Sequence, residues 1–417
     1  MSYNIPKTMR AVRLHGVGLE ALSLDEIPVP VPNNDQLLVR VDAAGVCTSL
    51  LKIIAQGPEH KQINGWDVKK FPLIMGDEGA VTVVQPGKNV AKRFPEGTRC
   101  VIQPAVDHPP IHYRERFNNN GRGMQRVAVG YTLPGHMADY MLVQEEIINA
   151  ECIIPLKDQT IPFFAGALCE PFSCCISAQD RHYHASQPTP ASERQLVKGL
   201  KRGGITMIVG SGPMGRFQAE AALRFKPKHL VIVDVRAERL DWVKQHIKPD
   251  AEKAGVQFHA IINDEVPAFL DTVANGLGVD DIVVAVGHRG VQIEAQQWLA
   301  KDGVVNLFGG LKRGEHILDL DAIRVHYDEI HVVGSSGGSP ADMIESLRMV
   351  STGEFKAGRY LSMVGSLDQA PAALEKIRLG ETDGKIVLYP QVKDMALTAV
   401  NGWTRKEEIA FIEGNKR

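Results

Sequence analysis

A glycine motif directly after a short apolar run constrains the fold of this chain more than any other feature. The run Ile205–Val209 is rich in β-branched residues, and the six residues after it match G-x-G-x-x-G. The first glycine of such a motif permits a tight turn, the second lets a pyrophosphate approach the backbone, and the third allows a helix to pack closely on the strand. The helix that follows directs its amide hydrogens and positive dipole end at the phosphates. The motif therefore predicts a dinucleotide-binding turn made of Gly210, Gly212, Pro213, Met214 and Gly215.

The next apolar run supports this interpretation and bears on the choice of cofactor. Leu230–Asp234 is a second β-branched run, and Asp234 lies 19 positions after Gly215. A carboxylate at this place can accept hydrogen bonds from the adenosine ribose hydroxyls, and it would repel a 2′-phosphate. NAD is therefore favoured over NADP. Arg236, two residues later, could accommodate the 2′-phosphate, so NADP is kept as an alternative.

Strand and helix signals alternate through this half of the chain. Apolar runs recur between stretches of helical spacing, at Phe258–Ile262, Asp281–Val286, Val304–Phe308 and His331–Gly334. Such alternation predicts a doubly wound parallel sheet with helices on both faces, an α/β domain of Rossmann type over residues 181–339. The polar stretch Ala185–Gly204 contains two prolines, and we interpret it as the connection between two domains.

The first 180 residues are rich in strand signals instead. In Gln36–Asp42 the apolar residues alternate with the others at period two, which is typical of a half-buried strand. Turn residues separate further short β candidates at Gly79–Val84, Thr98–Gln103 and Ala138–Val143. We expect a compact β-barrel-like domain.

Composition excludes several classes of function. Lys and Arg total 47 and Asp and Glu 49 in 417 residues, so a net charge of −2 gives no reason to expect nucleic acid as a partner. No apolar run is long enough to cross a bilayer, and the N-terminal residues lack the layout of a secretory signal. The six cysteines contain no C-x-x-C pair, and we expect reduced thiols. A soluble, cytoplasmic protein with no membrane partner follows as an expectation.

Four motifs together resemble the zinc-dependent medium-chain dehydrogenases: Gly45-Val46-Cys47, Gly76-Asp77-Glu78-Gly79, Glu170-Pro171 and the glycine motif at Gly210. The nearest resemblance is to the L-sorbose 1-phosphate reductase and polyol dehydrogenase branch, on Gln56-Gly57 with His60-Lys61 and on the late run Gly334–Gly338. The resemblance implies that residues 1–180 form a GroES-like catalytic barrel. It also implies that residues 340–417 return to this domain and add a C-terminal extension, for whose residues 391–417 we assign no role.

The resemblance implies a catalytic zinc, one per chain, held by Cys47, Asp77 and Glu170, with Glu78 as an adjacent alternate ligand. Asp77 stands where the family has histidine. This carboxylate adds a negative charge, which should weaken the ion's polarising effect and suit harder cations. The family's second, structural zinc needs four cysteines, and none lies between Val101 and Gly135, so a structural Cys₄ zinc is not expected. His108, His112 and His136 could bind a metal, but surface or hydrogen-bonded histidines are the simpler interpretation. The alternative for the ligand set is a solvated turn beside a buried thiol.

Other roles follow from position within the family. Ser49 would relay the proton of the substrate alcohol. Lys52 stands where many relatives have a relay histidine, and it could offset the charge of Asp77 or bind an anionic substrate group. His60 is a candidate substrate contact, and Lys385 matches a basic residue that contacts cofactor phosphate in relatives. Either lysine could instead be a solvated side chain.

These features predict a metal-dependent oxidoreductase that transfers a hydride between a nicotinamide cofactor and a secondary alcohol or ketone of a polyol or sugar, or of a sugar phosphate. We expect a homodimer or homotetramer. One alternative is a metal-free, NADPH-dependent enone or quinone reductase of the same superfamily. The other is a non-catalytic dinucleotide-binding protein, which would bind NAD without turnover.

Overall fold

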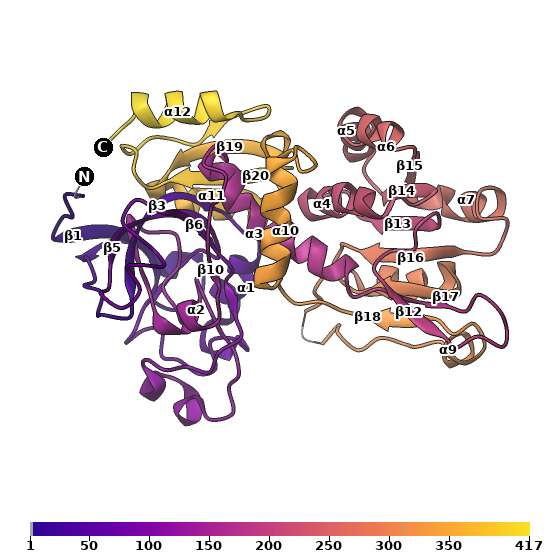
Figure 1. Cartoon of the computed structure of the whole chain (residues 1–417), viewed down its shortest axis with the longest axis horizontal. Coiled ribbons are helices and arrows are strands. Elements are labelled where there is room, and N and C mark those ends of the chain that lie inside the picture. Colours follow the sequence, from indigo (N-terminus) through magenta and orange to yellow (C-terminus); the bar gives the residue numbers. More distant parts are fainter. Residues whose placement is uncertain (1–2, 313) are drawn as a thin grey trace. The chain divides into compact units, whose positions relative to one another are not determined.

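The computed structural model describes residues 3–312 and 314–417. It divides into two compact units, the first formed by Met1–Pro171 with Ser339–Arg417 and the second by Phe172–Gly338 (Figure 1). The prediction that Ala185–Gly204 connects the two units is wrong. These residues belong to the second unit, where β11 (Tyr183–Ser186) and β12 (Gln195–Lys198) form an antiparallel hairpin. The chain passes from one unit to the other within α3 (Phe163–Gln179), and it returns just before α10 (Pro340–Ser351).

The first unit is built on an eight-stranded sheet with β3 (Leu37–Gly45) in its middle. β3 pairs antiparallel with three other strands of this sheet: β5 (Glu78–Pro86), β9 (Tyr140–Val143) and β20 (Lys385–Tyr389). The sheet continues through β6 (Arg99–Ile102) and β10 (Ile153–Pro155) at one end, and through β19 (Leu361–Ser366) and β21 (Thr398–Ala399) at the other. Smaller pairings are made by β1 (Thr8–Leu14), β2 (Leu22–Pro28) and β4 (Leu73–Ile74), and by β7 (Ala105–Val106) with β8 (Val127–Ala128). Strands 300 residues apart in sequence therefore share one sheet.

The prediction that Gln36–Asp42 is half-buried is wrong, because both faces of β3 are covered. Leu37, Val39 and Val41 are buried, and so are Leu38 and Asp42 on the alternate positions. Asp42 tolerates burial since its carboxylate accepts hydrogen bonds from Thr82 Oγ1 at 2.6 Å and from the Arg40 guanidinium at 2.7 Å. Polar pairing thus replaces the solvent that the sequence pattern implied.

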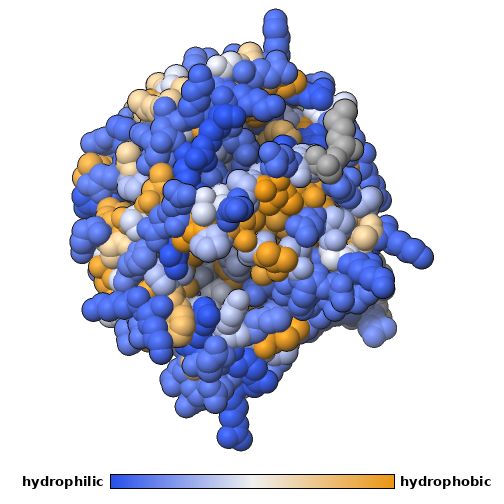
Figure 2. Space-filling model, turned by 90° about the vertical axis from the view of Figure 1, so that its left-hand side faces the viewer, coloured by the Kyte–Doolittle hydropathy of each residue, from blue (hydrophilic) through white to orange (hydrophobic). Residues whose placement is uncertain are grey.

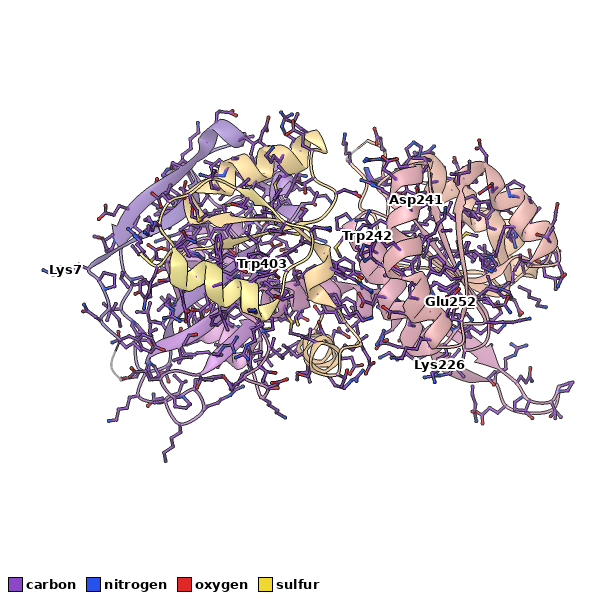
Figure 3. The ribbon with its side chains drawn as sticks, turned by 90° about the horizontal axis from the view of Figure 1, so that it is seen from above. Lys7, Lys226, Asp241, Trp242, Glu252 and Trp403 are labelled. Carbon is purple, nitrogen blue, oxygen red and sulfur yellow. The ribbon has the colours of Figure 1, made fainter. Side chains whose placement is uncertain are left out.

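Helices cover the sheet of the first unit. They include α1 (Ser49–Gln56), α2 (Glu145–Asn149), α11 (Ala370–Leu379) and α12 (Arg405–Gly414), together with the start of α3. The C-terminal segment, to which no role was assigned, folds back on this unit and ends in α12, drawn in yellow in Figure 1. Trp403, labelled in Figure 3 beside α12, donates its indole N–H to the hydroxyl of the buried Tyr389 at 2.9 Å. The segment is therefore an integral part of the first unit.

The second unit is the doubly wound domain that the sequence predicts. Its six parallel strands run in the order β15-β14-β13-β16-β17-β18, the order of a dinucleotide-binding sheet. The strands are β13 (Ile205–Val209), β14 (His229–Asp234), β15 (Gln257–Ile262), β16 (Val279–Val284), β17 (Leu299–Asn306) and β18 (His331–Val333). The helices include α4 (Pro213–Ala222), α5 (Ala237–His246), α6 (Lys248–Lys253), α7 (Val266–Thr272), α8 (Arg289–Glu294) and α9 (Ala322–Tyr327).

Each face of this sheet has its own core. Met207 and Val209 of β13 pack into one cluster with Phe269 of α7, whereas Ile208 packs into another with Leu240 of α5. Alternate residues of one strand thus enter opposite cores, which explains why Met207, Ile208 and Val209 are apolar at successive positions.

The face of the first unit shown in Figure 2 is predominantly hydrophilic, with apolar groups among the hydrophilic side chains. Across the described residues, no helix combines the length and apolar character that a membrane crossing demands.

Candidate active site

The register of β3, β5 and β20 brings the predicted metal ligands of the first unit together. Gly45 pairs with Glu78 on one side and with Val387 on the other, so Cys47 follows β3 close to the start of β5 and of β20. A side chain at Gly45 would place its Cβ 2.1 Å from Glu78 Oε2. Glycine is required here because the Glu78 carboxylate lies directly over the backbone.

In the carboxylates of Asp77 and Glu78, one oxygen has a hydrogen-bond partner and the other has none. Ser49 Oγ donates to Asp77 Oδ2 at 2.6 Å, and Lys385 Nζ donates to Glu78 Oε1 at 2.5 Å. Asp77 Oδ1 and Glu78 Oε2 are buried, and neither has a hydrogen-bond partner. Unpaired buried carboxylate oxygens are costly, and they are the groups that a bound cation would satisfy.

The electrostatics show an excess of negative charge. Burial, together with Asp77 and Glu78, raises the pKa of the Cys47 thiol well above its ordinary value, and Glu170 adds to this rise. Burial and the neighbouring Glu78 raise the pKa of Asp77 to about 6. Although burial acts in the opposite direction, Glu78, Cys47 and Asp77 raise the pKa of Lys385. One buried lysine thus faces a thiol and three acids, so the residues present fit a divalent cation.

Cys47, Asp77 and Glu170 nevertheless do not form a closed ligand set. Among residues 3–312 and 314–417, two groups of three metal-ligating side chains have ligand atoms that all lie within 4.8 Å of one another. Neither group contains Cys47, Asp77 or Glu170. Sharing one ion therefore requires the predicted ligands to move closer together. Glu170, on α3, is buried and acts electrostatically on Cys47, which places it at the same site.

Ser49, Tyr131 and His60 form one side of this site. Tyr131 shares a side-chain hydrogen bond with Ser49, and burial with the charges of Asp77 and Cys47 raises the Tyr131 pKa. The His60 ring lies 5.5 Å from the Tyr131 ring, centroid to centroid. Burial and then the charge of Lys52 lower the pKa of His60, while Lys52 itself is exposed on α1. The sequence indicated Ser49, Lys52 and His60 but not Tyr131, which lies in a loop without a motif.

Lys385 has a partner that the sequence did not suggest. Its side chain is buried in the first unit against Glu78, so it supplies a positive charge for which the sequence offered Lys52 as one candidate. Its contact with a cofactor phosphate stays a prediction. Of the histidines left open, His136 is buried with Nδ1 3.2 Å from the Gly76 carbonyl oxygen, and His108 Nδ1 lies 2.7 Å from the Pro109 carbonyl oxygen.

The glycine motif of the second unit has the tight geometry that dinucleotide binding needs. Gly210 has φ +96°, and a Cβ at Gly215 would lie 1.7 Å from the Gly210 carbonyl oxygen. Gly212 is the residue before α4, whose first turn contains Pro213 and Met214. Gly210 N–H donates to the Val233 carbonyl and Ser211 N–H to Asp234, so the amides of Gly212, Met214 and Gly215 are the ones that can face a phosphate.

Asp234 ends β14 next to this turn. One carboxylate oxygen accepts hydrogen bonds from the Ser211 N–H at 2.6 Å and from Ser211 Oγ at 3.1 Å, and the other accepts from the Arg236 N–H at 2.9 Å. Arg239 Nη1 lies 3.9 Å from Asp234 Oδ2, whereas the Arg236 side chain pairs with Glu238. The acidic group is thus fixed in position beside the phosphate-binding turn. Trp242 on α5, labelled in Figure 3, lies under the Arg216 guanidinium at 4.2 Å, which joins α5 to α4.

A Rossmann turn in one unit and a thiol–carboxylate site in a barrel-like unit define a metal-assisted nicotinamide oxidoreductase. Comparison with known families agrees: the alcohol dehydrogenase GroES-like domain matches residues 33–153, and the zinc-binding dehydrogenase domain matches residues 213–352. The chain belongs to the zinc-dependent medium-chain dehydrogenase family, as the resemblance of its motifs predicted.

Curated relatives cover nearly the whole chain. Mannitol-1-phosphate 5-dehydrogenase of Aliivibrio fischeri is 29% identical over 94% of this chain and 89% of its own. The protein YggP of Escherichia coli is 30% identical over 93% of this chain and 88% of its own, and L-sorbose 1-phosphate reductase of Klebsiella pneumoniae is 28% identical over 87% and 84%. The fold is confirmed by (2R,3R)-butanediol dehydrogenase of Bacillus subtilis, with a TM-score of 0.71 at 20% identity over 92% of this chain and 99% of that one.

Proposed function

We propose that this protein interconverts a secondary alcohol and a ketone on a phosphorylated polyol or sugar, using NAD(H) and one zinc ion at Cys47, Asp77 and Glu170. The observation that supports the metal most strongly is the half-buried Cys47 thiol beside Asp77 and Glu78, because each of these acids has a buried carboxylate oxygen without a hydrogen-bond partner. When bound, the ion would act as a Lewis acid toward the substrate oxygen. Glu78 would serve as an alternate ligand whose charge Lys385 balances.

The protein's own groups hold and move the proton. Ser49 Oγ lies between the Asp77 carboxylate and the Tyr131 hydroxyl, so it can accept a proton from a substrate hydroxyl while passing its own to Asp77 Oδ2, to which it already donates. The backbone amides of Gly212, Met214 and Gly215 would bind the pyrophosphate of the cofactor, and the nicotinamide carries the hydride. Because Ser49 is already hydrogen-bonded on both sides, its orientation is fixed before substrate binds.

The choice of a phosphorylated substrate is supported by cations beside the site and by the relatives. Lys52 is exposed and close enough to His60 to affect its ionisation, and Lys61 is exposed just beyond it. Mannitol-1-phosphate 5-dehydrogenase and L-sorbose 1-phosphate reductase, by their names, act on hexose derivatives with a phosphate at one end. Lys52 and His60 would bind that phosphate as charge-assisted hydrogen-bond donors.

Preference for NAD is supported by the position of Asp234. Its carboxylate is buried and held by Ser211, beside the turn where the adenosine ribose would lie. A 2′-phosphate there would face this charge, and the Arg236 side chain is engaged with Glu238. A homodimer or homotetramer and a cytoplasmic location remain predictions.

Metal analysis combined with a substrate panel tests the proposal. The purified protein should contain zinc, and it should form NADH from hexitol phosphates faster than from the unphosphorylated hexitols. Cys47→Ser and Glu170→Gln should lose zinc and turnover together, because each removes a ligand. Lys52→Met should raise KM for the phosphorylated substrate and leave KM for the free polyol unchanged. Full activity after chelator treatment, or reduction of enones without metal, would refute the assignment.

A further inference from the structure

A second cluster of metal-ligating side chains lies in the first unit, away from Cys47. His112, Glu145 and Glu146 offer ligand atoms that all lie within 4.8 Å of one another. His112 belongs to the loop-rich segment between β7 and β8, drawn in purple below α2 in Figure 1, and the two glutamates open α2. His112 Nε2 lies 2.6 Å from Glu145 Oε2.

Among these three residues, Glu146 gives the strongest indication of a bound cation. It is 1% exposed, and Oε1 accepts hydrogen bonds from the backbone N–H groups of Ile111 at 2.8 Å and His112 at 3.0 Å. Its other oxygen, Oε2, is buried without any hydrogen-bond partner. A buried carboxylate oxygen with no donor costs free energy unless another group, such as a cation, satisfies it.

Glu145 is prepared to remain ionised beside it. Although burial raises its pKa, hydrogen bonds from Asn33 and Gln36, with help from His112, lower the pKa of Glu145 to about 2. Asn33 Nδ2 donates to Oε1 at 2.9 Å, and Gln36 Nε2 donates to Oε2 at 2.8 Å. These partners also fix the orientation of the carboxylate, as outer partners do around a metal ligand.

We propose that His112, Glu145 and Glu146 form a second divalent-cation site that cross-links the 107–126 segment to α2. One imidazole and two carboxylates suit zinc or manganese. His112 and Glu145 keep 29% and 17% of their side chains exposed, so an ion and its water ligands have access. The ligands are unlike the cysteines of a structural Cys₄ zinc, which this segment lacks.

The other histidine–carboxylate group in the described residues lacks this signal. In the second unit, His182 Nδ1 and His184 Nε2 lie 2.6 and 2.9 Å from Asp281 Oδ1, and the Lys201 N–H donates to Oδ2 at 2.7 Å. Both oxygens of Asp281 are therefore satisfied within the protein. His182 Nε2 is buried without a partner, but it lies across the ring from the Nδ1 that faces Asp281, so hydrogen bonding explains the three facing groups without an ion.

Elemental analysis of zinc-loaded variants tests the proposal on the full chain. Glu146→Gln keeps an oxygen that can accept from the Ile111 and His112 amides but loses the charge, so it should fold. His112→Gln and Glu146→Gln should each hold about one zinc fewer per chain than the parent, and affinity at this site should fall at least about tenfold. His108→Gln is the matched control, since His108 lies in the same segment and outside the cluster, and it should match the parent.

Cobalt substitution separates this site from the one at Cys47. Cobalt bound by a thiolate gives a sulfur-to-metal charge-transfer band, whereas imidazole and carboxylate ligands give none. The band should be unchanged in His112→Gln and Glu146→Gln, and Cys47→Ser should lose the band while keeping the second ion. Equal zinc content in the parent and both cluster variants would overturn the proposal. Loss of the thiolate band along with the ion in those variants would overturn it as well.

Discussion

Glu408 links the C-terminal helix to the helix that carries Glu170, and its replacement gives a quantitative prediction. The Glu408 carboxylate accepts hydrogen bonds from the first two amides of α3, Phe163 N–H and Phe164 N–H, both at 2.8 Å. It also accepts one from the Tyr389 hydroxyl at 3.1 Å. The Glu408 oxygens thus satisfy donors at the start of α3 that have no partner within the helix. Glu408→Ala removes this cap and leaves the side chain's space unfilled.

The magnitude follows from the donors left without a partner. Each buried donor that loses its acceptor costs about 1 to 3 kcal/mol, and the loss of an N-cap alone costs about 0.5 to 2 kcal/mol. Water can reach some of these groups, so we expect a total loss of about 2 to 4 kcal/mol. For a unit of this size, each kcal/mol lowers Tm by about 2 to 4 °C, which gives a decrease of about 4 to 16 °C.

The pH dependence adds a signature specific to this group. Burial outweighs the amide hydrogen bonds and raises the pKa of Glu408 from 4.5 to about 7. The folded state thus holds this proton more tightly than the unfolded chain. Its contribution to stability is complete below about pH 4.5 and is lost as pH rises through 7, by up to about 3 kcal/mol. Glu408→Gln cannot titrate, so its stability should fall less than that of the parent between pH 5 and 8.

Scanning calorimetry and urea denaturation of the parent, Glu408→Ala and Glu408→Gln would measure these effects. Glu413→Ala is the matched control, because Glu413 is an exposed glutamate on the same helix. Its Tm should stay within about 2 °C of the parent, since exposed substitutions usually change stability by less than about 0.5 kcal/mol. A decrease below 2 °C for Glu408→Ala, or the same pH dependence in the parent and Glu408→Gln, would refute the reasoning.

Three further predictions concern the two sites. In steady-state assays NAD⁺ should give a higher kcat/KM than NADP⁺. Asp234→Ala should bring the two kcat/KM values closer together, because it removes the carboxylate that repels the 2′-phosphate of NADP⁺. A higher kcat/KM with NADP⁺ for the parent would contradict this prediction. Lys385→Met should lower the free energy of unfolding by about 3 to 5 kcal/mol in urea titrations, because it leaves the buried charge of Glu78 unpaired; a loss under 1 kcal/mol would show that the pair is not buried in solution. Gly215→Ala should abolish NAD binding in calorimetric titrations, since its Cβ would lie 1.7 Å from the Gly210 carbonyl oxygen. Unchanged affinity for NAD would mean that the turn is looser than described.

Features carried by contiguous residues were predictable from the sequence. The turn at Gly210–Gly215 and the acidic end of β14 lie within one strand–helix–strand unit, and local backbone geometry dictates each residue. Cys47 and Asp77 could be found in the same way, because short motifs at strand ends mark them. That these strands are parallel followed from their alternation with helices, whereas their order did not.

Pairings between distant residues were decided by the tertiary structure alone. Lys385 meets Glu78 across 307 positions, and Glu408 meets Phe163 across 245. No periodic pattern links such positions, since a side chain's partner across a sheet depends on strand order and register. Burial then decides the chemistry: the same lysine would be a solvated charge on an exposed strand, and here it is the counterion of a buried acid. Sequence motifs thus marked the candidate site residues, while strand pairing determined their partners.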